Sequence, residues 1–303
     1  MGAVCWQVLQ GLSKNKFMSI SYSVIGVGKL GKSLTAALHR AGYPLISLWN
    51  HNTDKARKLI GQLHLNADYG RLPSRAEDVG DIIFICVPDR QIESLVNQLT
   101  SIELKGKIVV HTSGGHPASV LQPLAENGAS VAAFHPLQTF SGLLSPEVFE
   151  NVWISIQGDQ EAVSGLELLA KNLGAHPVEV SEDDKIRLHI AAIFASNYLV
   201  TLMDLARRSV EAPELRQNLP HMFRALMDQT LTNIRMQGPE KALTGPLSRG
   251  DISTVSKHLK KLEANRDLSE MYRLLGKATL PLVERNGELD QELISQLTSL
   301  LDE

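Results

Sequence analysis

The sequence SYSVIGVGKLG (residues 21–31) passes from a strand pattern to a helix pattern across three glycines. Residues 21–27 are mostly apolar and predict a buried strand, and a helical period follows over Leu30–Arg40. This context fits the dinucleotide-binding fingerprint: the first glycine makes a tight turn, the second admits a pyrophosphate and the third lets helix and strand pack closely. The helix N-terminus would hold the phosphates through its free N–H groups. The alternative is a glycine turn without a ligand; the fingerprint predicts cofactor contacts from Gly26, Gly28, Lys29, Leu30 and Gly31.

Short apolar runs alternate with helical periods from this first strand to about Val180. The run DIIFICV (residues 81–87) is typical of a strand that is buried on both faces of a parallel sheet. Strands separated by helices predict an α/β fold with a Rossmann-type, mostly parallel sheet over residues 19–180. Strand patterns then stop, and residues 181–303 predict an all-helical C-terminal domain that begins with a capped helix at Ser181.

The composition excludes several classes of protein. The 303 residues are 43% hydrophobic and 21% charged with a formal net charge of −3, so bulk charge would not hold nucleic acid or anionic lipid. No run approaches about 18 consecutive apolar residues, so we expect no membrane-spanning helix and no membrane partner. Two cysteines, Cys5 and Cys86, are too few for a disulfide framework and favour a reducing, cytoplasmic location. Residues 1–18 are expected to form a loose extension.

The end of the second strand favours NADP over NAD. An NAD site has an Asp or Glu there to bind the ribose 2′-hydroxyl. Here the segment WNHNT (residues 49–53) contains no acid, and Lys55 and Arg57 follow. Polar donors could hold a 2′-phosphate, although the two cations could equally lie on a solvated helix face. The predicted cofactor contacts at this strand end are Asn50, His51, Asn52 and Thr53. The end of DIIFICV adds Val87 and Pro88, which could instead form an ordinary turn.

Three polar clusters follow strand ends or lie on the long helix after residue 181. They are HTSGGH (residues 111–116), FHPLQTF (residues 134–140) and the helix positions Lys185, His189, Ser196 and Asn197. Hydride transfer to or from a carbonyl or imine needs a group that exchanges a proton and hydrogen bonds that polarise the reacting atom. Histidine suits the proton step because its pKa lies near neutrality. The predicted catalytic residues are His135, His189, Asn197, Ser113 and Lys185.

Each of these residues also has a structural interpretation. His135 and His189 could be buried and hydrogen-bonded, and Lys185 could be a surface charge. The turn TGPLSRGD (residues 244–251) presents Arg249, which could clamp a substrate carboxylate or phosphate, or could pair with Asp251. No HExxH or cysteine-pair spacing supports a metal site, so none is expected. The predicted substrate-binding residues are Arg249, Ser196 and Gln138.

Together the motifs GVGKLG, HTSGG, FHPLQTF, HIAAIFASN and LTGPLSRGD resemble a family of uncharacterised, predicted NADP-dependent oxidoreductases. Its members have a Rossmann-like domain followed by a helical domain of formerly unknown function. The wider relatives are the 6-phosphogluconate-dehydrogenase-like enzymes, among them pyrroline-5-carboxylate reductase, ketopantoate reductase, prephenate dehydrogenase and the β-hydroxyacid dehydrogenases. The resemblance implies a catalytic role for His135, as in prephenate dehydrogenases, and for Lys185, as in β-hydroxyacid dehydrogenases. It also implies a homodimer formed through the helical domain.

Two functions are therefore open. The first is an NADP-dependent oxidoreductase that transfers a hydride to or from a small polar, anionic carbonyl, imine or hydroxy substrate in the cleft between the domains. The second is a non-catalytic NADP(H)-binding redox sensor or partner-binding module. Substrate turnover that depends on His135 or His189 would distinguish the first from the second.

Overall fold

The computed structural model of the chain describes residues 20–142 and 145–302, so the expected extension at residues 1–18 lies outside the described residues. The chain divides into two compact units, with the boundary between Ile193 and Phe194. The sequence predicts a domain boundary after Val180, whereas the first unit also includes helix α8 (Glu182–Ala192).

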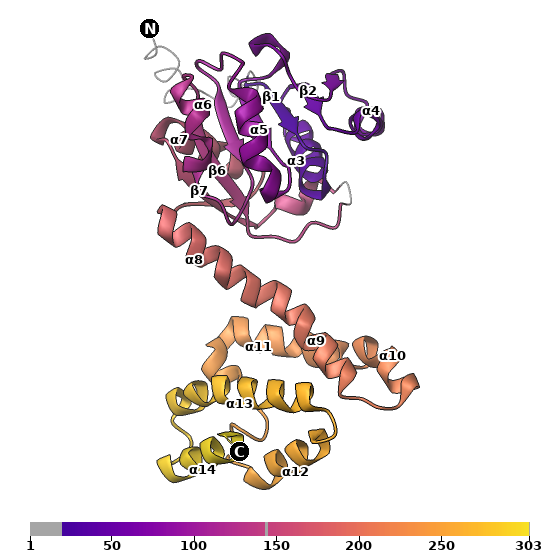
Figure 1. Cartoon of the computed structure of the whole chain (residues 1–303), viewed down its shortest axis with the longest axis vertical. Helices are drawn as coiled ribbons and strands as arrows, with labels where there is room; N and C mark the ends of the chain where they lie inside the picture. Colours follow the sequence, from indigo (N-terminus) through magenta and orange to yellow (C-terminus); the bar gives the residue numbers. More distant parts are fainter. Residues whose placement is uncertain (1–19, 143–144, 303) are drawn as a thin grey trace. The chain divides into compact units, whose positions relative to one another are not determined.

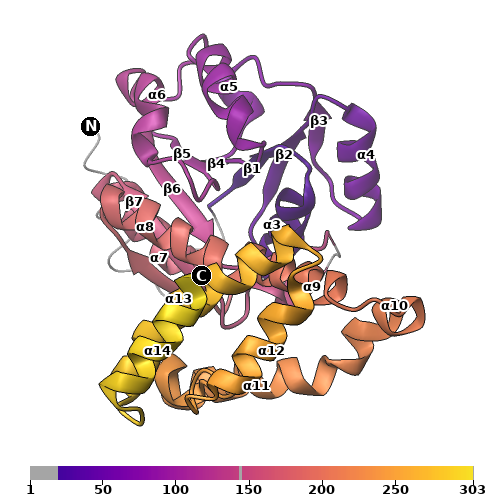
Figure 2. The same cartoon turned by 60° about the horizontal axis from the view of Figure 1, so that its bottom comes forward.

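The first unit contains an eight-stranded sheet in the order β3-β2-β1-β4-β5-β6-β7-β8. Figure 2 shows strands β3, β2, β1, β4, β5 and β6 side by side. All neighbouring strands are parallel except β6 and β7, which confirms the predicted Rossmann-type, mostly parallel sheet. The strands are β1 (Tyr22–Ile25), β2 (Leu45–Trp49), β3 (Asp68–Gly70), β4 (Ile82–Ile85), β5 (Ile108–His111), β6 (Ser130–Pro136), β7 (Trp153–Gly158) and β8 (His176–Glu179).

Strand β7 runs antiparallel to β6, with His135 opposite Ser155. The sequence predicts a mostly parallel sheet, and this pair is its antiparallel exception. The described part of the connection holds only the short 3-10 helix η4 (Pro146–Phe149). A parallel pair needs a longer crossover, usually an α-helix, to carry the chain back, so β7 pairs with its neighbour in the opposite direction.

Helices cover both faces of the sheet and form a separate core on each (Figure 1). Side chains alternate along each strand, so Val24 and Phe84 belong to one core while Ile25 and Ile85 belong to the other. Helices α3 (Lys29–Arg40), α4 (Thr53–Gln62) and α7 (Gln160–Asn172) pack on the first core. Helices α5 (Ile92–Leu99) and α6 (Gln122–Glu126) pack on the second. The apolar faces of the predicted helices therefore account for both layers around the sheet.

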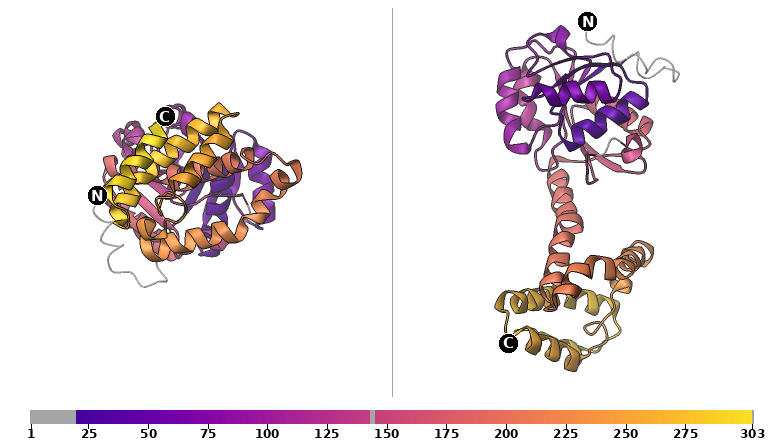
Figure 3. Two further views of the ribbon diagram at one scale, coloured as in Figure 1. Left: turned by 90° about the horizontal axis from the view of Figure 1, so that it is seen from below. Right: turned by 90° about the vertical axis from the view of Figure 1, so that its right-hand side faces the viewer.

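The second unit is helical, as the sequence predicts (Figure 3). Its core is formed by the side chains Val255, Leu259, Leu280, Leu297 and Leu301, which come from three helices. The π-helical segment Ile193–Asn197 joins α8 to α9, so that one continuous helix runs from Glu182 to Arg208. The helices are α9 (Tyr198–Arg208), α10 (Pro213–Met222), α11 (Arg224–Ala242), α12 (Ile252–Leu262), α13 (Arg266–Asn286) and α14 (Gln291–Asp302).

The continuous helix Glu182–Arg208 is long and apolar enough to cross a membrane by length and composition, contrary to our expectation for this sequence. The expectation required an uninterrupted apolar run, whereas an average over 18 residues tolerates polar positions such as Ser196 and Asn197. Hydropathy alone is weak evidence here, because a single helix of a soluble protein can pass the same test.

Candidate active site and cofactor cradle

The glycine turn after β1 lies tightly against the sheet. Gly26 has a φ of +106°, and a Cβ atom there would lie 2.5 Å from the carbonyl oxygen of Cys86. A Cβ atom on Gly31 would lie 2.0 Å from the carbonyl oxygen of Gly26. No side chain fits at these two positions, so the fingerprint glycines are required by the backbone. The turn thus brings the start of α3 close to the ends of β1 and β4.

The N-terminus of α3 is open to an anion. Gly28 is the N-cap residue and supplies no side-chain cap, and the first turn of the helix contains no acid. Gly28 and Lys29 are exposed, and Leu30 is half-buried. The free N–H groups and the positive end of the helix dipole are therefore available to a phosphate. These features of the turn fit the pyrophosphate of a dinucleotide.

Asn50 connects the glycine turn to the end of β2. Its buried side chain accepts a hydrogen bond from the Val27 N–H at 3.0 Å and donates one to the Asn52 carbonyl at 2.8 Å. The sequence predicts Asn50 as a cofactor contact, and the structure shows it bracing two segments of the cradle. Asn52 caps α4 by accepting the Asp54 N–H, and Thr53 is the first residue of that helix.

A cavity of about 850 Å³ opens beside the glycine turn. Its walls include four of the predicted cofactor residues: Gly26, Asn50, His51 and, after β4, Val87. Lys55 and Arg57 are not among its lining residues, and Arg57 pairs with Asp54 on its own helix at 2.9 Å. Pro88 is also outside the lining and precedes the 3-10 helix η2 (Asp89–Gln91).

Two arginines in this cavity were missed by the sequence reasoning. Arg71 follows β3, and Arg90 belongs to η2 after β4. The sequence around β3, ADYGRL (residues 67–72), has no apolar run that would mark a strand, so nothing placed Arg71 beside the end of β2. An arginine immediately after a glycine is too common a pattern to have identified it.

His111 braces the loop that follows β5. Its Nδ1 accepts the Ser113 N–H at 3.2 Å, and its Nε2 lies 3.1 Å from the Pro117 carbonyl, to which it donates. The side chain is fully buried, and burial lowers its pKa to about 4. Neutral His111 thus holds both ends of the segment from Ser113 to Pro117 in place.

Ser113 is also bound within this loop. Its hydroxyl oxygen accepts the N–H groups of Gly115 and His116, both at 3.2 Å, and its Oγ lies 3.2 Å from His116 Nδ1. The same Nδ1 lies 3.6 Å from Asp89 Oδ2. The hydroxyl predicted to polarise a substrate therefore has three partners inside the protein.

Lys185 reaches from α8 to the loop after β5. Its Nζ donates to the carbonyl oxygens of Ser113 at 2.7 Å and Gly114 at 3.3 Å. Only 1% of the residue is exposed, so the interpretation of Lys185 as a surface charge is wrong. Burial lowers the pKa of the ammonium group to about 8, against the opposing effect of the Asp89 carboxylate. Lys185 is thus a buried cation at neutral pH that can lose its proton slightly above it.

The imidazoles of His135 and His189 lie together over Gly114. Their ring centroids are 5.6 Å apart and their planes make an angle of 77°. A Cβ atom on Gly114 would lie 2.4 Å from His189 Nδ1 and 2.7 Å from His135 Nε2. The Nδ1 atom of His189 is buried and has no hydrogen-bond partner among the described residues. The imidazoles of His135 on β6 and His189 on α8 therefore meet at the loop to which Lys185 is hydrogen-bonded.

Burial and nearby charge together keep His135 neutral. Burial is the largest cause, and the nearby Lys185 ammonium adds to it, so that its pKa falls to about 4. At neutral pH the cluster thus contains a neutral His135 beside a protonated Lys185 and the Asp89 carboxylate. An arrangement of this kind can accept a hydrogen bond on an imidazole and deliver a proton from the ammonium group.

The remaining predicted residues lie outside this cluster or in the second unit. Gln138 is exposed in the loop after β6, where its side chain accepts the Thr139 N–H at 2.9 Å. Ser196 and Asn197 lie in the π-helical segment, beyond the unit boundary. Arg249 is exposed, while Asp251, its alternative partner, caps α12 through the Thr254 N–H. The structure brings His135, His189, Lys185 and Ser113 together within the first unit.

The loop after β6 connects this cluster to the glycine turn. It begins just after His135 and extends to Gly142, where a Cβ atom would lie 3.2 Å from Cγ of Lys29. Lys29 is the first residue of α3. A single short segment therefore runs from the imidazoles to the phosphate end of the cradle. Among the residues that the structure describes, no group of His, Cys, Asp and Glu is arranged to hold a metal ion.

Two family models match the chain. Residues 11–136 match a Rossmann-like domain, and residues 152–279 match a domain of unknown function, DUF2520. None of the curated proteins compared with the chain matches it in sequence.

Solved structures share the fold at low sequence identity. An NADP oxidoreductase from Bacteroides fragilis, so named, is 23% identical with a TM-score of 0.70, covering 86% of this chain and 98% of its own. A protein from Thermotoga maritima is 23% identical with a TM-score of 0.67, covering 88% and 99%. A reductive aminase from Aspergillus terreus in complex with NADPH and ethyl levulinate is 17% identical with a TM-score of 0.58, covering 94% and 99%. The chain therefore matches a Rossmann-like model followed by a DUF2520 model, the same domain order that its sequence motifs resemble.

Proposed function

We propose that this protein is an NADP-dependent oxidoreductase that transfers a hydride to or from a small polar, anionic carbonyl, imine or hydroxy substrate. One observation carries the proposal: His135, His189 and the buried Lys185 ammonium converge on Gly114, in the same unit whose β1 ends in the open glycine turn. The names of the similar structures, an NADP oxidoreductase and a reductive aminase bound to NADPH, support the choice of chemistry and coenzyme.

The residues of the cradle fit a dinucleotide, whose nicotinamide would supply or accept the hydride. Backbone N–H groups at the start of α3 would hold the pyrophosphate, while Asn50 keeps the turn and the end of β2 in register. Val87 would offer an apolar contact at the end of β4. These contacts position the coenzyme and perform no proton transfer.

The cluster at Gly114 would handle the proton and the charge. Reduction of a carbonyl or imine leaves an oxygen or nitrogen that must take up a proton. Lys185 carries an acidic proton at neutral pH, which the neutral imidazole of His135 can accept, and the imidazole of His189 lies beside it. The buried ammonium also favours a substrate that carries a negative charge. We leave open which of the two histidines contacts the reacting atom.

Two substitutions test this function. His135→Ala and His189→Asn should each lower the turnover of NADPH with the right carbonyl or imine substrate by about 100-fold or more, because each removes a group that exchanges or stabilises the proton. NADPH affinity should stay within about threefold, since neither residue lines the cofactor cavity. A panel of small oxo acids and imines, followed by NADPH absorbance, identifies the substrate for this comparison.

Two results would contradict the proposed oxidoreductase function. Purified protein that binds NADPH but turns over no member of the panel, with or without these substitutions, would favour the non-catalytic sensor. Protein that binds neither NADPH nor NADH would remove the proposal altogether.

We also propose a homodimer formed through the helical unit. Large apolar side chains are exposed on α9 and α11, among them Val200 at 72% and Met236 at 81%. Exposed apolar surface of this extent marks an interaction site. A lipid bilayer is a poorer occupant, because Lys185 and His189 hold the first turns of the continuous helix against the sheet unit. The free thiol of Cys86 is compatible with the proposed cytoplasmic location.

A further inference from the structure

Arg71 lies where the cofactor cavity meets the end of β2. The Asn50 N–H donates to the Gly70 carbonyl at 2.9 Å, so β2 and β3 end side by side. His51 and Arg71 each follow a residue of this pair, and both residues line the cavity. The two strand ends thus present an imidazole and a guanidinium group to the same space.

Within the described part of the chain, the Arg71 guanidinium group has no competing partner. Arg71 makes no ion pair or side-chain hydrogen bond with any of the residues that the structure describes. No acidic residue is found among the described residues that line the cavity. Other arginines in the described part of the chain are paired with carboxylates, such as Arg57 with Asp54 and Arg75 with Glu77. Arg71 is therefore left free to bind a ligand anion.

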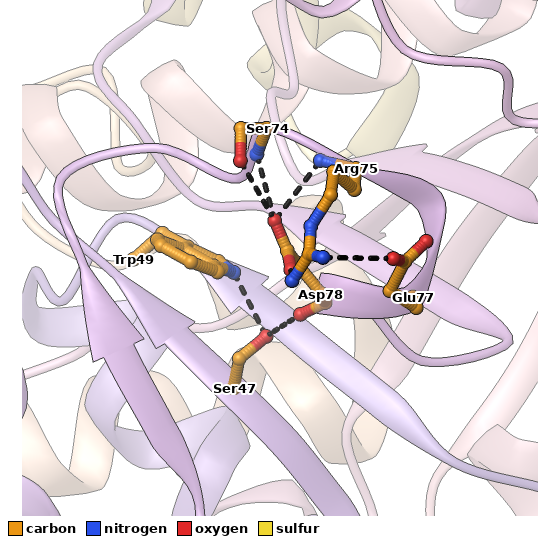
Figure 4. Close-up of polar contacts among 6 residues, drawn as sticks. All are labelled: Ser47, Trp49, Ser74, Arg75, Glu77 and Asp78. Carbon is orange, nitrogen blue, oxygen red and sulfur yellow. Dashed lines mark hydrogen bonds and ion pairs between the residues drawn. The ribbon is translucent and has the colours of Figure 1, made fainter.

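The segment that follows Arg71 in the chain, from Ser74 to Asp78, is tied to β2 by a network of hydrogen bonds (Figure 4). The Trp49 indole N–H donates to Ser47 Oγ at 2.8 Å, and the Ser47 hydroxyl donates to the Asp78 carbonyl at 2.7 Å. The Asp78 carboxylate accepts the backbone N–H groups of Ser74 and Arg75, both at 2.9 Å. The segment from Ser74 to Asp78 is thereby tied to β2.

The Trp49 ring also fixes the distance between the two strand ends. A Cβ atom on Gly70 would lie 2.4 Å from this ring, so the backbone just before Arg71 packs directly on the indole. Only a glycine allows that approach. The base of the Arg71 side chain is therefore positioned by packing as well as by hydrogen bonds.

We infer that Arg71, with His51 beside it, binds the 2′-phosphate of NADP and sets the preference for NADP over NAD. The inference rests on the proposed function, and it replaces Lys55 and Arg57 as the source of the positive charge. A phosphate monoester carries a charge of about −1.5 to −2 at neutral pH and three acceptor oxygens. The planar guanidinium group matches two of these oxygens at once, which a lysine cannot do.

The other cations near this strand end are less suitable. Arg57 is engaged by Asp54, and Lys55 is exposed on α4 outside the cavity lining. Arg90 lines the cavity from the end of β4, which lies on the far side of β1 from β2 and β3. Arg71 is the arginine that adjoins the strand end where the ribose 2′-position is expected.

Calorimetric titration of the full chain with four nucleotides tests the inference. The probes are NADPH, NADH, and the fragments adenosine 2′,5′-bisphosphate and adenosine 5′-monophosphate. Arg71→Ala should weaken NADPH and the bisphosphate by about 10- to 100-fold, because a charge-assisted hydrogen-bond pair is lost. NADH and the monophosphate should change by less than about threefold. The NADPH affinity of Arg71→Lys should fall between those of wild type and Arg71→Ala, because lysine keeps the positive charge but cannot make two parallel hydrogen bonds to the phosphate.

Lys58→Ala is the matched control. It removes the same charge from an exposed position on α4, a neighbouring helix, and should leave all four affinities unchanged. Equal weakening of NADPH and NADH by Arg71→Ala would overturn the inference, as would a wild-type preference for NADH or an unchanged NADPH affinity. Failure of the wild-type protein to bind any of the four nucleotides would instead contradict the proposed function, and the inference with it.

Discussion

Gly114 determines how closely the imidazoles of His135 and His189 approach the loop after β5. A methyl group added to Gly114 would clash with both imidazole rings. The sequence identified HTSGGH as a candidate site because of its hydroxyls and histidines. In the structure, Gly114 at the centre of this motif allows the two imidazoles to approach, whereas the Ser113 hydroxyl is hydrogen-bonded within its own loop.

Substitution of this glycine should therefore block the site. Gly114→Ala places Cβ 2.4 Å from His189 Nδ1, so the rings must move apart, and we expect at least a tenfold loss of turnover. Overpacking should also lower the free energy of unfolding by about 1–3 kcal/mol. Steady-state kinetics and urea unfolding measure the two effects.

Gly115→Ala provides the comparison. A Cβ atom there would meet its nearest neighbour, Asp89 Oδ2, at 3.5 Å, which is an ordinary contact. Turnover and stability of this variant should be close to wild type. If both alanine variants behave alike, the close approach at Gly114 has no role in the reaction.

Some individual residues could be assigned from the sequence and others could not. His135 and His189 were predicted because histidines at a strand end and on a helix near it are chemically suited to proton exchange. Ser113 was predicted to polarise the substrate by hydrogen bonding, but its three partners within the protein come from the turn geometry of residues 113–116. Arg71 was missed because its position depends on a strand pairing that its own sequence does not indicate.

At the level of elements, strands β5 and β6 each place a neutral histidine near the same sheet edge, His111 fully buried and His135 half-buried. The pKa of His111 and that of His135 are both lowered to about 4 by burial, from an ordinary value of 6.5. The unfolded chain takes up these protons below about pH 6.5, whereas the folded chain does so only near pH 4. The stabilising contribution is complete above pH 6.5 and is lost as the pH falls towards 4.

This gives a measurable dependence of stability on pH. Each histidine should lower the free energy of unfolding by about 1.4 kcal/mol per pH unit between these limits. In urea unfolding the wild type should lose about 2 kcal/mol more than His135→Gln between pH 6.5 and pH 5, since the variant lacks one of the two groups. Parallel curves for the two proteins would contradict the assignment of a lowered pKa to His135.

The elements also show where local sequence stops being informative. Apolar runs and helical periods predicted the strands and helices that form the two cores. β3 has only three residues, Asp68–Gly70, and depends on pairing with β2 for its existence. The direction of β7 depends on the length of a connection, which hydrophobic periodicity does not report.

At the level of the whole molecule, the exposed apolar side chains of the helical unit are the main feature without a partner in a single chain. Leu226 on α11 is 61% exposed, and Val200 on α9 is 72% exposed. Leu226→Glu and Val200→Glu should each shift the protein towards a monomer, because a buried charge without a partner opposes association. Gln229→Glu, at an exposed polar position on α11, should not.

Light scattering during size-exclusion chromatography measures the outcome. The wild type should elute with twice the chain mass of 33.3 kDa, and the two apolar-to-acid variants should approach the single-chain mass. A wild-type protein that is monomeric at micromolar concentration would contradict the proposed dimer. Co-flotation of wild-type protein with anionic vesicles would instead favour a membrane as the occupant of this surface.

The indole of Trp49 gives the protein an internal optical reporter. It is almost fully buried, its N–H is held by Ser47, and its ring packs on Gly70 at the edge of the cofactor cavity. Trp153, by contrast, is 55% exposed at the start of β7. Reduced nicotinamide absorbs light at the wavelengths where indole emits, so arrival of the coenzyme would quench the bluer, solvent-shielded part of the emission. The residue that steadies the adenosine end of the cradle would thereby signal when the cradle is filled.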